Sequence, residues 1–260
     1  MLYLIKIGTT TITDDSGKLD LEIMSNIAKQ TEKLVQKGIK VILISSGAIG
    51  CGMRTLAMTE RPKNEEITTK QICASVGQAV LMSRWQTCFG DRIVSQHLIT
   101  SSIFLNSRNL QDFKNCLYKA LEMGIVPIIN ENDAVSTEEI DTIFTDNDSL
   151  AVEVSLAIGA DKLVILSDIN GLYDMNPKEN PDAKIIKQIQ KIDEKILSMA
   201  SGKSTLGTGG MRAKLQAISR ANEAGIKVFL TNGKRVNSVL ETEDLAIFSG
   251  TLFDKNDKLS

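Results

Sequence analysis

The chain has few of the residues that several common catalytic centres require. It contains one histidine, His97, which excludes His-rich zinc sites and HExxH proteases and argues against a Ser-His-Asp triad. Its four cysteines form no Cys-x-x-Cys pair and are too sparse for a disulfide scaffold, so we expect a reduced, cytoplasmic protein. Any chemistry must therefore use Lys, Asp, Asn, Ser and Thr side chains and backbone amides.

An excess of charge of one sign is also missing, because 30 Lys and Arg stand against 32 Asp and Glu. A nucleic-acid-binding surface needs a clear basic excess, so nucleic acid is not an expected partner. No run of 18 apolar residues occurs and the first residues lack a basic n-region, so neither a membrane span nor a signal peptide is predicted. The 42% hydrophobic and 24% charged content indicates a soluble globular chain with a sizeable core.

Short β-rich runs alternate with longer segments of helical periodicity. Strands are predicted at residues 2–8, 39–46, 93–99, 125–129, 162–168 and 226–230. Helices are predicted at 20–37, 71–89, 107–123, 147–158 and 210–224, the first with Asp20 as N-cap and Gly38 after its end. This alternation predicts an α/β fold with a mainly parallel sheet covered on both faces. We expect a surface loop at 175–183 and a hairpin at 134–145.

Polar and small residues follow nearly every predicted strand, where the ligands of open parallel sheets gather. One such segment is explained by turn geometry alone, but six together predict a ligand site. The segments are 6–10, 45–50, 130–133, 145–148, 167–171 and 207–214.

Two common phosphate-binding motifs do not match. Gly202-Lys203-Ser204 lacks the upstream glycine of a P-loop, and the glycines of residues 47–52 have the order GxxGxG instead of GxGxxG. The glycine-rich helix start at 207–210 remains, since backbone N–H groups and a helix N-terminus favour an anion. Lys214, one turn later, can reach the same anion. An ordinary turn beside a solvated lysine is an equally open interpretation.

Two further features are ambiguous from the residues alone. Lys6 lies in an apolar strand, where a buried ammonium needs an anion, although an edge-strand lysine facing water is the alternative. The Asp146-Asn147-Asp148 run is suited to holding Mg²⁺, to orienting lysines or to capping a helix. His97 is expected to be structural.

Seven motifs lie in one collinear series that covers nearly the whole chain. They are Lys6-x-Gly8-Thr9, Ser45-Ser46-Gly47-Ala48, Ile129-Asn130-Glu131-Asn132-Asp133-Ala134-Val135, Asp146-Asn147-Asp148, Asp168-x-x-Gly171-Leu172-Tyr173, Gly207-Thr208-Gly209-Gly210-Met211-x-x-Lys214 and Gly250-Thr251-Leu252-Phe253. This series resembles the amino-acid kinase family, and within it the glutamate 5-kinases. Aspartate kinases, acetylglutamate kinases and UMP kinases share the lysines and glycine turns but differ in the other blocks, above all in Asn130–Asp133.

The resemblance implies a three-layer αβα sandwich of about eight strands over residues 1–254. A polar tail at 255–260 would follow, without the PUA domain that many bacterial relatives carry. The implied reaction is ATP-dependent phosphorylation of the side-chain carboxylate of L-glutamate to glutamyl 5-phosphate, the first step of proline biosynthesis. Also implied are Mg²⁺ carried with ATP and not held by protein side chains, proline as a feedback inhibitor, and a homodimer or homotetramer.

The same resemblance assigns the site residues. Lys6, Lys214 and Asp148 would be catalytic, with Asp148 orienting the lysines. Substrate binding would fall to Ser46, Gly47, Ala48, Asn130, Asp133 and Asn147. Nucleotide binding would fall to Lys6, Gly8, Thr9, Ser167, Asp168, Thr208, Gly209, Gly210, Met211, Arg212, Ala213 and Lys214.

The chain departs from the family pattern at Thr145, where glycine is usual, in a slightly longer preceding hairpin, and at Ala213, where Thr or Ser is common. Two alternative functions stay open. A UMP-kinase-like enzyme would need a basic acceptor pocket, whereas residues 130–133 are acidic. A non-catalytic amino-acid or nucleotide sensor would lack one of the two lysines, and both are present.

Overall fold

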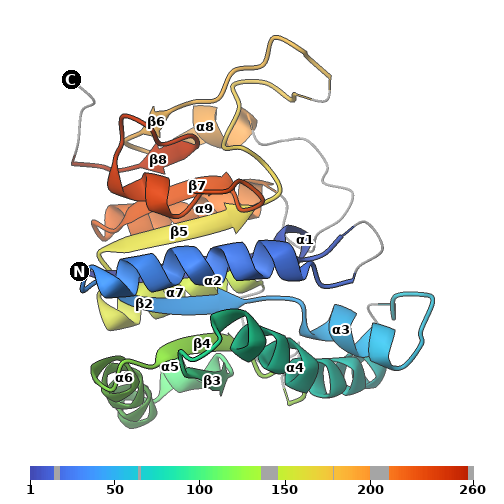
Figure 1. Cartoon of the computed structure of the whole chain (residues 1–260). Coiled ribbons are helices and arrows are strands. Elements are labelled where there is room, and N and C mark those ends of the chain that lie inside the picture. Colours follow the sequence, from blue (N-terminus) through green and yellow to red (C-terminus); the bar gives the residue numbers. More distant parts are fainter. Residues whose placement is uncertain (15–17, 64–65, 136–145, 178, 200–210, 257–260) are drawn as a thin grey trace.

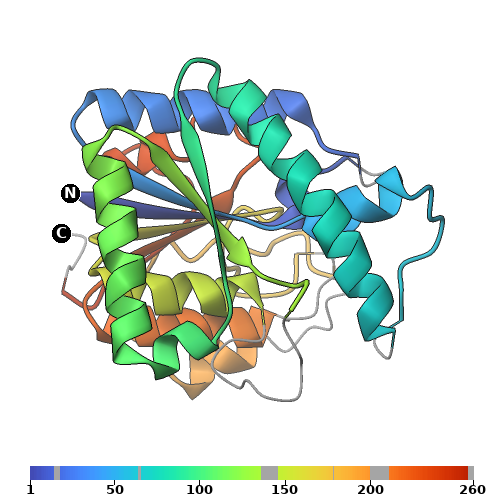
Figure 2. The same cartoon turned by 90° about the horizontal axis from the view of Figure 1, so that it is seen from below.

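The computed structural model describes residues 1–14, 18–63, 66–135, 146–177, 179–199 and 211–256. An eight-stranded sheet lies between two layers of helices (Figures 1 and 2), as expected for an α/β sandwich. The strands are β1 (Leu2–Ile7), β2 (Lys40–Ser45), β3 (Val94–Ile99), β4 (Val126–Glu131), β5 (Lys162–Ser167), β6 (Gln188–Ile189), β7 (Lys227–Asn232) and β8 (Thr251–Phe253). The helices are α1 (Thr9–Ile12), α2 (Leu21–Gln36), α3 (Ala48–Thr55), α4 (Ile67–Phe89), α5 (Ser102–Leu105), α6 (Ser107–Glu122), α7 (Asn147–Ile158), α8 (Glu194–Met199), α9 (Met211–Glu223) and the 3₁₀ helix η1 (Leu240–Glu243).

The strand order is β3-β4-β2-β1-β5-β7-β8-β6. All neighbours are parallel except β7 and β8, which pair antiparallel. Strand β1 lies between β2 and β5, with Lys6 opposite Ile44 and Ile165. The alternative of Lys6 as an edge-strand residue facing water is therefore wrong.

Alternate residues of the central strands face two separate cores. On one face, Leu2 and Leu4 pack with apolar residues of α6, α7 and α9. On the other face, Tyr3, Ile5 and Ile7 pack with residues of α2 and α4. Figure 2 shows the two helix layers on opposite sides of the sheet. Because side chains alternate along a strand, Lys6 is placed on the α7 and α9 face.

The predicted strands and long helices are confirmed, with small shifts at their ends. The Asp20 carboxylate caps α2 by accepting from the Glu22 and Ile23 N–H groups, and Gly38 has a φ of 79° after the helix end. Helix α4 starts at Ile67, four residues earlier than the prediction of 71. The expected loop at 175–183 has no helix or strand in its described residues, and a bridge between Tyr173 and Ile185 closes it.

Several short elements were not predicted. Helix α3 begins directly after Gly47, in a segment whose three glycines give a low helix propensity. Strands β6 and β8 have two and three residues, which is too short for a periodicity to show. The hairpin prediction at 134–145 falls mostly on residues 136–145, outside the described residues.

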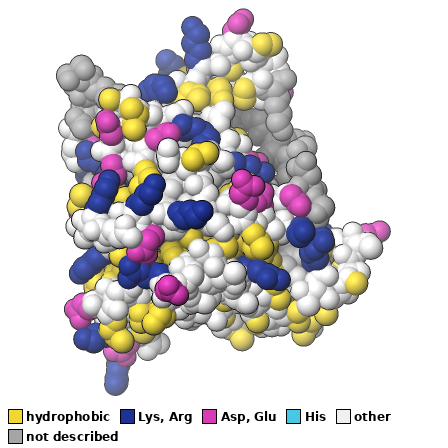
Figure 3. Space-filling model, viewed as in Figure 1, with side chains coloured by type: hydrophobic (Ala, Val, Ile, Leu, Met, Phe, Trp, Pro, Cys, Tyr) yellow, Lys and Arg dark blue, Asp and Glu magenta, His cyan; other side chains and the backbone are white. Residues whose placement is uncertain are grey.

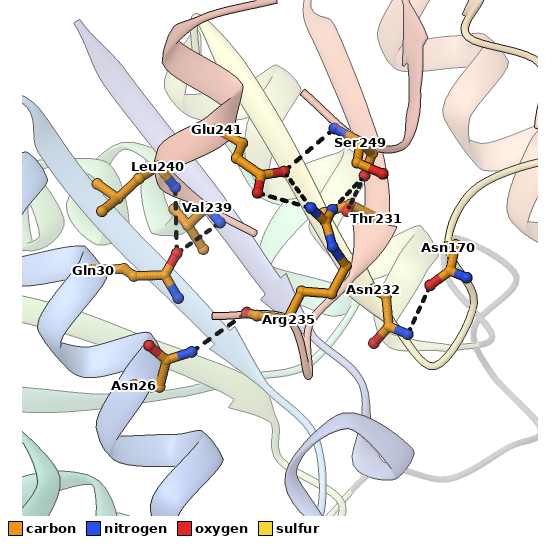
Figure 4. Close-up of polar contacts among 10 residues, drawn as sticks. All are labelled: Asn26, Gln30, Asn170, Thr231, Asn232, Arg235, Val239, Leu240, Glu241 and Ser249. Carbon is orange, nitrogen blue, oxygen red and sulfur yellow. Dashed lines mark hydrogen bonds and ion pairs between the residues drawn. The ribbon is translucent and has the colours of Figure 1, made fainter. Parts of the chain in front are cut away.

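The segment after β7 is fixed to the sheet by polar contacts (Figure 4). Arg235 donates to both carboxylate oxygens of Glu241, at 2.7 and 2.8 Å, and to the Ser249 carbonyl at 2.8 Å. Gln30 of α2 accepts from the Val239 N–H at 2.8 Å. Both Glu241 oxygens accept from one guanidinium nitrogen and the Ser249 carbonyl accepts from the other, and these charge-assisted hydrogen bonds hold the loop beside the end of β7.

On the face seen in Figure 3, basic and acidic side chains are interspersed. This matches the nearly balanced composition. Among the helices that the structure describes, none combines the length and apolar character needed to cross a membrane.

Candidate active site

Two buried lysines converge on one buried carboxylate. The Lys6 ammonium lies 2.7 Å from Oδ1 of Asp148, and the Lys214 ammonium contacts Oδ2 of the same residue. The three side chains are 7–11% exposed. Burial alone would raise the pKa of Asp148, but the two ammonium groups outweigh it and hold the pKa at about 2. Burial lowers the pKa of Lys6 from its usual value, and Asp148 opposes this shift.

Three distant segments build this cluster. Lys6 belongs to the central strand β1, Asp148 to the first turn of α7, and Lys214 to the first turn of α9. Helix α7 is started by Asp146, whose carboxylate accepts from the Ser149 N–H at 2.8 Å. In the Asp146-Asn147-Asp148 run, Asp146 therefore caps a helix and Asp148 holds the two lysines. These are two of the three roles that the sequence left open for this run.

Beside the lysines, a chain of polar side chains crosses the carboxyl ends of β2 and β4. The amide nitrogen of Asn147 donates to the Ser46 hydroxyl at 2.6 Å and to the Asn130 carbonyl oxygen at 3.1 Å. The amide nitrogen of Asn130 donates in turn to the Gln78 carbonyl oxygen at 3.0 Å. Three predicted substrate residues thus lie together, and Gln78 of α4 joins them.

Helices α3 and α4 approach so closely that their backbones touch. A Cβ on Gly77 would lie 1.8 Å from the Ala48 carbonyl oxygen, and one on Gly52 would lie 1.7 Å from the Cys73 carbonyl oxygen. Gly47, with a φ of 113°, turns the chain from β2 into α3. Ala48 is buried at this contact, where it packs α3 against α4.

Asp133 follows this cluster in the turn after β4. Burial, with a smaller contribution from the negative charge of Glu131, raises the pKa of the Asp133 carboxyl to about 7. A cationic group placed beside it would favour the ionised form. Without such a group, the Asp133 carboxyl is only partly ionised at neutral pH.

The described residues of the predicted nucleotide site lie at the ends of β1 and β5 and at the start of α9. The Gly8 N–H donates to the Leu166 carbonyl at 3.1 Å, and Thr9 is exposed at the start of α1. The Ser167 hydroxyl donates to Asp168 at 3.2 Å at the end of β5. Beside them, the Asn232 amide donates to Asn170 at 2.9 Å, which connects the ends of β5 and β7 (Figure 4).

The structure describes only some of the residues predicted to bind the nucleotide at the start of α9. Met211 packs against the core, whereas the Arg212 side chain is directed to Glu194 of α8, at 3.8 Å. Ala213 is half-buried in the first turn of the helix. Thr208, Gly209 and Gly210 lie outside the described residues, as does Thr145.

The family model of the amino acid kinase family matches residues 1–232, which is most of the chain. The chain belongs to the amino acid kinase family. A protein of Clostridium acetobutylicum named glutamate 5-kinase is 42% identical over 98% of this chain and 94% of its own length. Proteins of the same name from Clostridium perfringens and Streptococcus thermophilus are 39% and 40% identical, over 96% and 97% of this chain and 93% and 96% of their own lengths.

Two solved structures of other kinases share the fold. A UMP kinase from Bacillus anthracis superposes with a TM-score of 0.64 at 14% identity, over 99% of this chain and 97% of its own. An isopentenyl phosphate kinase from T. acidophilum gives a TM-score of 0.67 at 18% identity, over 97% and 100% of the two chains. At these identities the likeness concerns the fold alone.

One residue of this polar cluster is not among the predicted site residues. Gln78 is 7% exposed and hydrogen-bonded to Asn130, yet it lies inside a predicted helix and follows no strand. In the sequence, only the polar Gln78 beside Gly77 within an otherwise helical segment could have indicated it. His97 lies on β3, accepts or donates a 2.9 Å hydrogen bond with Ser95, and packs edge-on against Phe113.

Among the residues that the structure describes, no three His, Cys, Asp or Glu side chains group in a way that could hold a metal ion. Both carboxylate oxygens of Asp148 are in contact with lysines.

Proposed function

We propose that this chain transfers the terminal phosphoryl group of ATP to the side-chain carboxylate of L-glutamate. The product would be glutamyl 5-phosphate, which makes this the first step of proline biosynthesis. The observation that carries the proposal is the pair of buried lysines on Asp148, beside the amide cluster of Ser46, Asn147 and Asn130. The relatives named glutamate 5-kinase, about 40% identical over nearly the whole chain, support the choice of acceptor.

The lysine cluster suits phosphoryl transfer. Such a reaction depends on positioning and on stabilising charge that spreads over the phosphoryl oxygens. Two ammonium groups against one carboxylate leave the cluster with a net charge of +1 in a buried setting, where electrostatic interactions are strong. Asp148 keeps Lys6 and Lys214 in place before the reaction, so little reorganisation accompanies it.

The acceptor end suits an amino acid. The Ser46 hydroxyl and the Asn147 amide offer hydrogen bonds to an α-carboxylate and an α-ammonium, and Asp133 offers a negative charge to the ammonium. The side-chain carboxylate of glutamate has a pKa near 4.3 and is ionised at neutral pH. It needs no general base, which fits a chain with one histidine located on β3.

The nucleotide is proposed to bind across the ends of β1, β5 and α9. Gly8 and Thr9, Ser167 and Asp168, and the segment from Thr208 to Lys214 would contact it. Mg²⁺ bound to the ATP phosphates would neutralise part of their charge. In this proposal Asp148 does not ligate the metal, because its oxygens hold the two lysines.

The acceptor is tested by measuring ADP release with glutamate, aspartate, acetylglutamate or UMP. Turnover with glutamate alone is the expected result, and the Lys214→Ala variant serves as the control for contaminating kinases. Preference for UMP would establish the nucleotide-kinase alternative. No turnover with any acceptor, together with saturable binding of ATP or glutamate, would establish the sensor alternative. Proline inhibition and a homodimer or homotetramer remain predictions drawn from the resemblance.

A further inference from the structure

The geometry points to Gln78 as a positioning residue that fixes which way the Asn130 and Asn147 amides face, and so which groups the site presents to the amino acid. This inference rests on the proposed function. It concerns a residue of α4 that belongs to none of the polar segments at the strand ends.

The hydrogen bonds between these side chains have a fixed direction: Asn147 donates to Asn130, and Asn130 donates to Gln78. An Asn side chain has one NH₂ group with two donors and one carbonyl oxygen that only accepts. Both donors of Asn147 are used, one by Ser46 at 2.6 Å and one by Asn130 at 3.1 Å. The Asn147 carbonyl oxygen is thus left to accept, as an ammonium ion requires. Ser46 already accepts from Asn147, so its own O–H is free to donate, as a carboxylate requires.

Gln78 provides the final hydrogen-bond acceptor, which keeps the Asn130 amide in this orientation. The Asn130 amide nitrogen donates to the Gln78 carbonyl oxygen at 3.0 Å, and both residues are buried, at 3% and 7% exposure. Without that acceptor, the Asn130 NH₂ group would be a buried donor without a partner. Rotating the Asn130 amide by half a turn would relieve this cost, because its NH₂ group would then face Asn147.

Such a rotation would change what the substrate meets. Asn147 would have to present its carbonyl oxygen to Asn130, and its NH₂ group would then turn toward the substrate. An NH₂ group repels an ammonium ion where a carbonyl oxygen attracts it. The orientation of Gln78 therefore affects binding of the α-amino group through two intervening side chains.

The backbone holds Gln78 at the required place. Its neighbour Gly77 has no Cβ, and a Cβ there would lie 1.8 Å from the Ala48 carbonyl oxygen. This close contact brings α4 against the start of α3, which follows Ser46 and Gly47 in the chain. The glutamine next to Gly77 can then reach the end of β4.

The test compares Gln78→Met, which keeps the shape but removes the acceptor, with Gln78→Glu, which keeps an acceptor oxygen. Activity is measured with glutamate and with glutarate, which lacks the α-amino group. For Gln78→Met we expect the glutamate KM to rise about tenfold or more, the size expected for a buried donor left unpaired, with the ATP KM unchanged. The preference for glutamate over glutarate should fall by a similar factor. Gln78→Glu should restore most of that preference, and the remote change Gln36→Met should alter neither value.

The outcomes separate this inference from the function on which it rests. If the wild-type protein does not phosphorylate glutamate, the proposed function fails and the role of Gln78 fails with it. If the wild-type protein is active and Gln78→Met keeps the wild-type preference for glutamate over glutarate, only the role of Gln78 is overturned. Equal rises in the glutamate and glutarate KM would also overturn it, as they would indicate a general loss of packing. Should Gln78→Met not fold, Gln78→Asn, whose amide is one methylene too short to reach Asn130, is expected to give the same loss of preference.

Discussion

The Lys6 ammonium lies 2.7 Å from the Asp148 carboxylate, where the central strand β1 approaches the first turn of α7. Both side chains are buried, so water cannot take the place of either one as the partner of the other charge. Burying one charge without its partner is costly, so each residue fixes the position of the other. Lys214, on the other oxygen of Asp148, takes part in the same mutual positioning.

Removing either lysine should strongly slow catalysis without unfolding the chain. Lys214→Ala and Lys6→Ala are each expected to lower kcat by about 10²–10³-fold, the usual loss when one stabiliser of the transition state is removed. Circular dichroism and the thermal midpoint check that each variant is folded. Either variant retaining more than about a tenth of wild-type turnover would exclude the catalytic role of that lysine.

Asp148 should make stability depend on acid pH. Its pKa is about 2 in the folded chain and near 3.9 when unfolded, so its stabilising effect is present above pH 4 and is lost as the pH falls toward 2. Asp148→Asn leaves two buried ammonium groups and should cost about 3–5 kcal/mol at pH 7. Urea unfolding of both proteins at pH 7 and pH 3 measures this. A stability difference of the same size at both pH values would show that the carboxylate charge is not responsible.

Asp133→Asn should raise the glutamate KM far more than the ATP KM. Because the pKa of Asp133 is raised to about 7, the wild-type carboxyl becomes negative as the pH rises through neutrality. Its ionised fraction increases about tenfold between pH 6 and pH 8, so the glutamate KM should fall by up to about that factor. The Asn variant should lose this pH dependence. Equal effects on the two KM values would indicate a structural role for Asp133.

His97→Gln should leave kcat within about threefold of wild type, as expected for a residue without a catalytic role. Its ring contacts Ser95 and Phe113 on β3 and α6, and burial lowers its pKa from the usual value. At saturating glutamate, kcat should show no rise between about pH 6 and pH 7. A folded but inactive variant would mean that the acceptor needs a base, and would argue against a carboxylate.

Gly77→Ala should destabilise the chain and weaken glutamate binding together. A Cβ at this position meets the Ala48 carbonyl oxygen at 1.8 Å, so α4 must move, at a cost of about 1–3 kcal/mol. Gly50→Ala in α3 is the matched control, because a Cβ there has no neighbour within 4 Å. It should stabilise the chain by up to about 1 kcal/mol. Similar denaturation midpoints for the two variants would show that the contact between α3 and α4 can relax.

The sequence by itself determined the order of the six longer strands and of the long helices, since apolar periodicity and caps such as Asp20 are local. The residues alone predicted a counter-ion for Lys6 only if this lysine is buried, and the resemblance named Asp148 as the residue that orients the lysines. The tertiary structure decided both points, because β1 lies in the middle of the sheet and Asp148 and Lys214 reach it from more than a hundred residues away. The place of Gln78 in the site was also decided only by the tertiary structure. Its role depends on the close approach of α4 to α3, and a contact between two helices leaves no periodic signal in the sequence of either one.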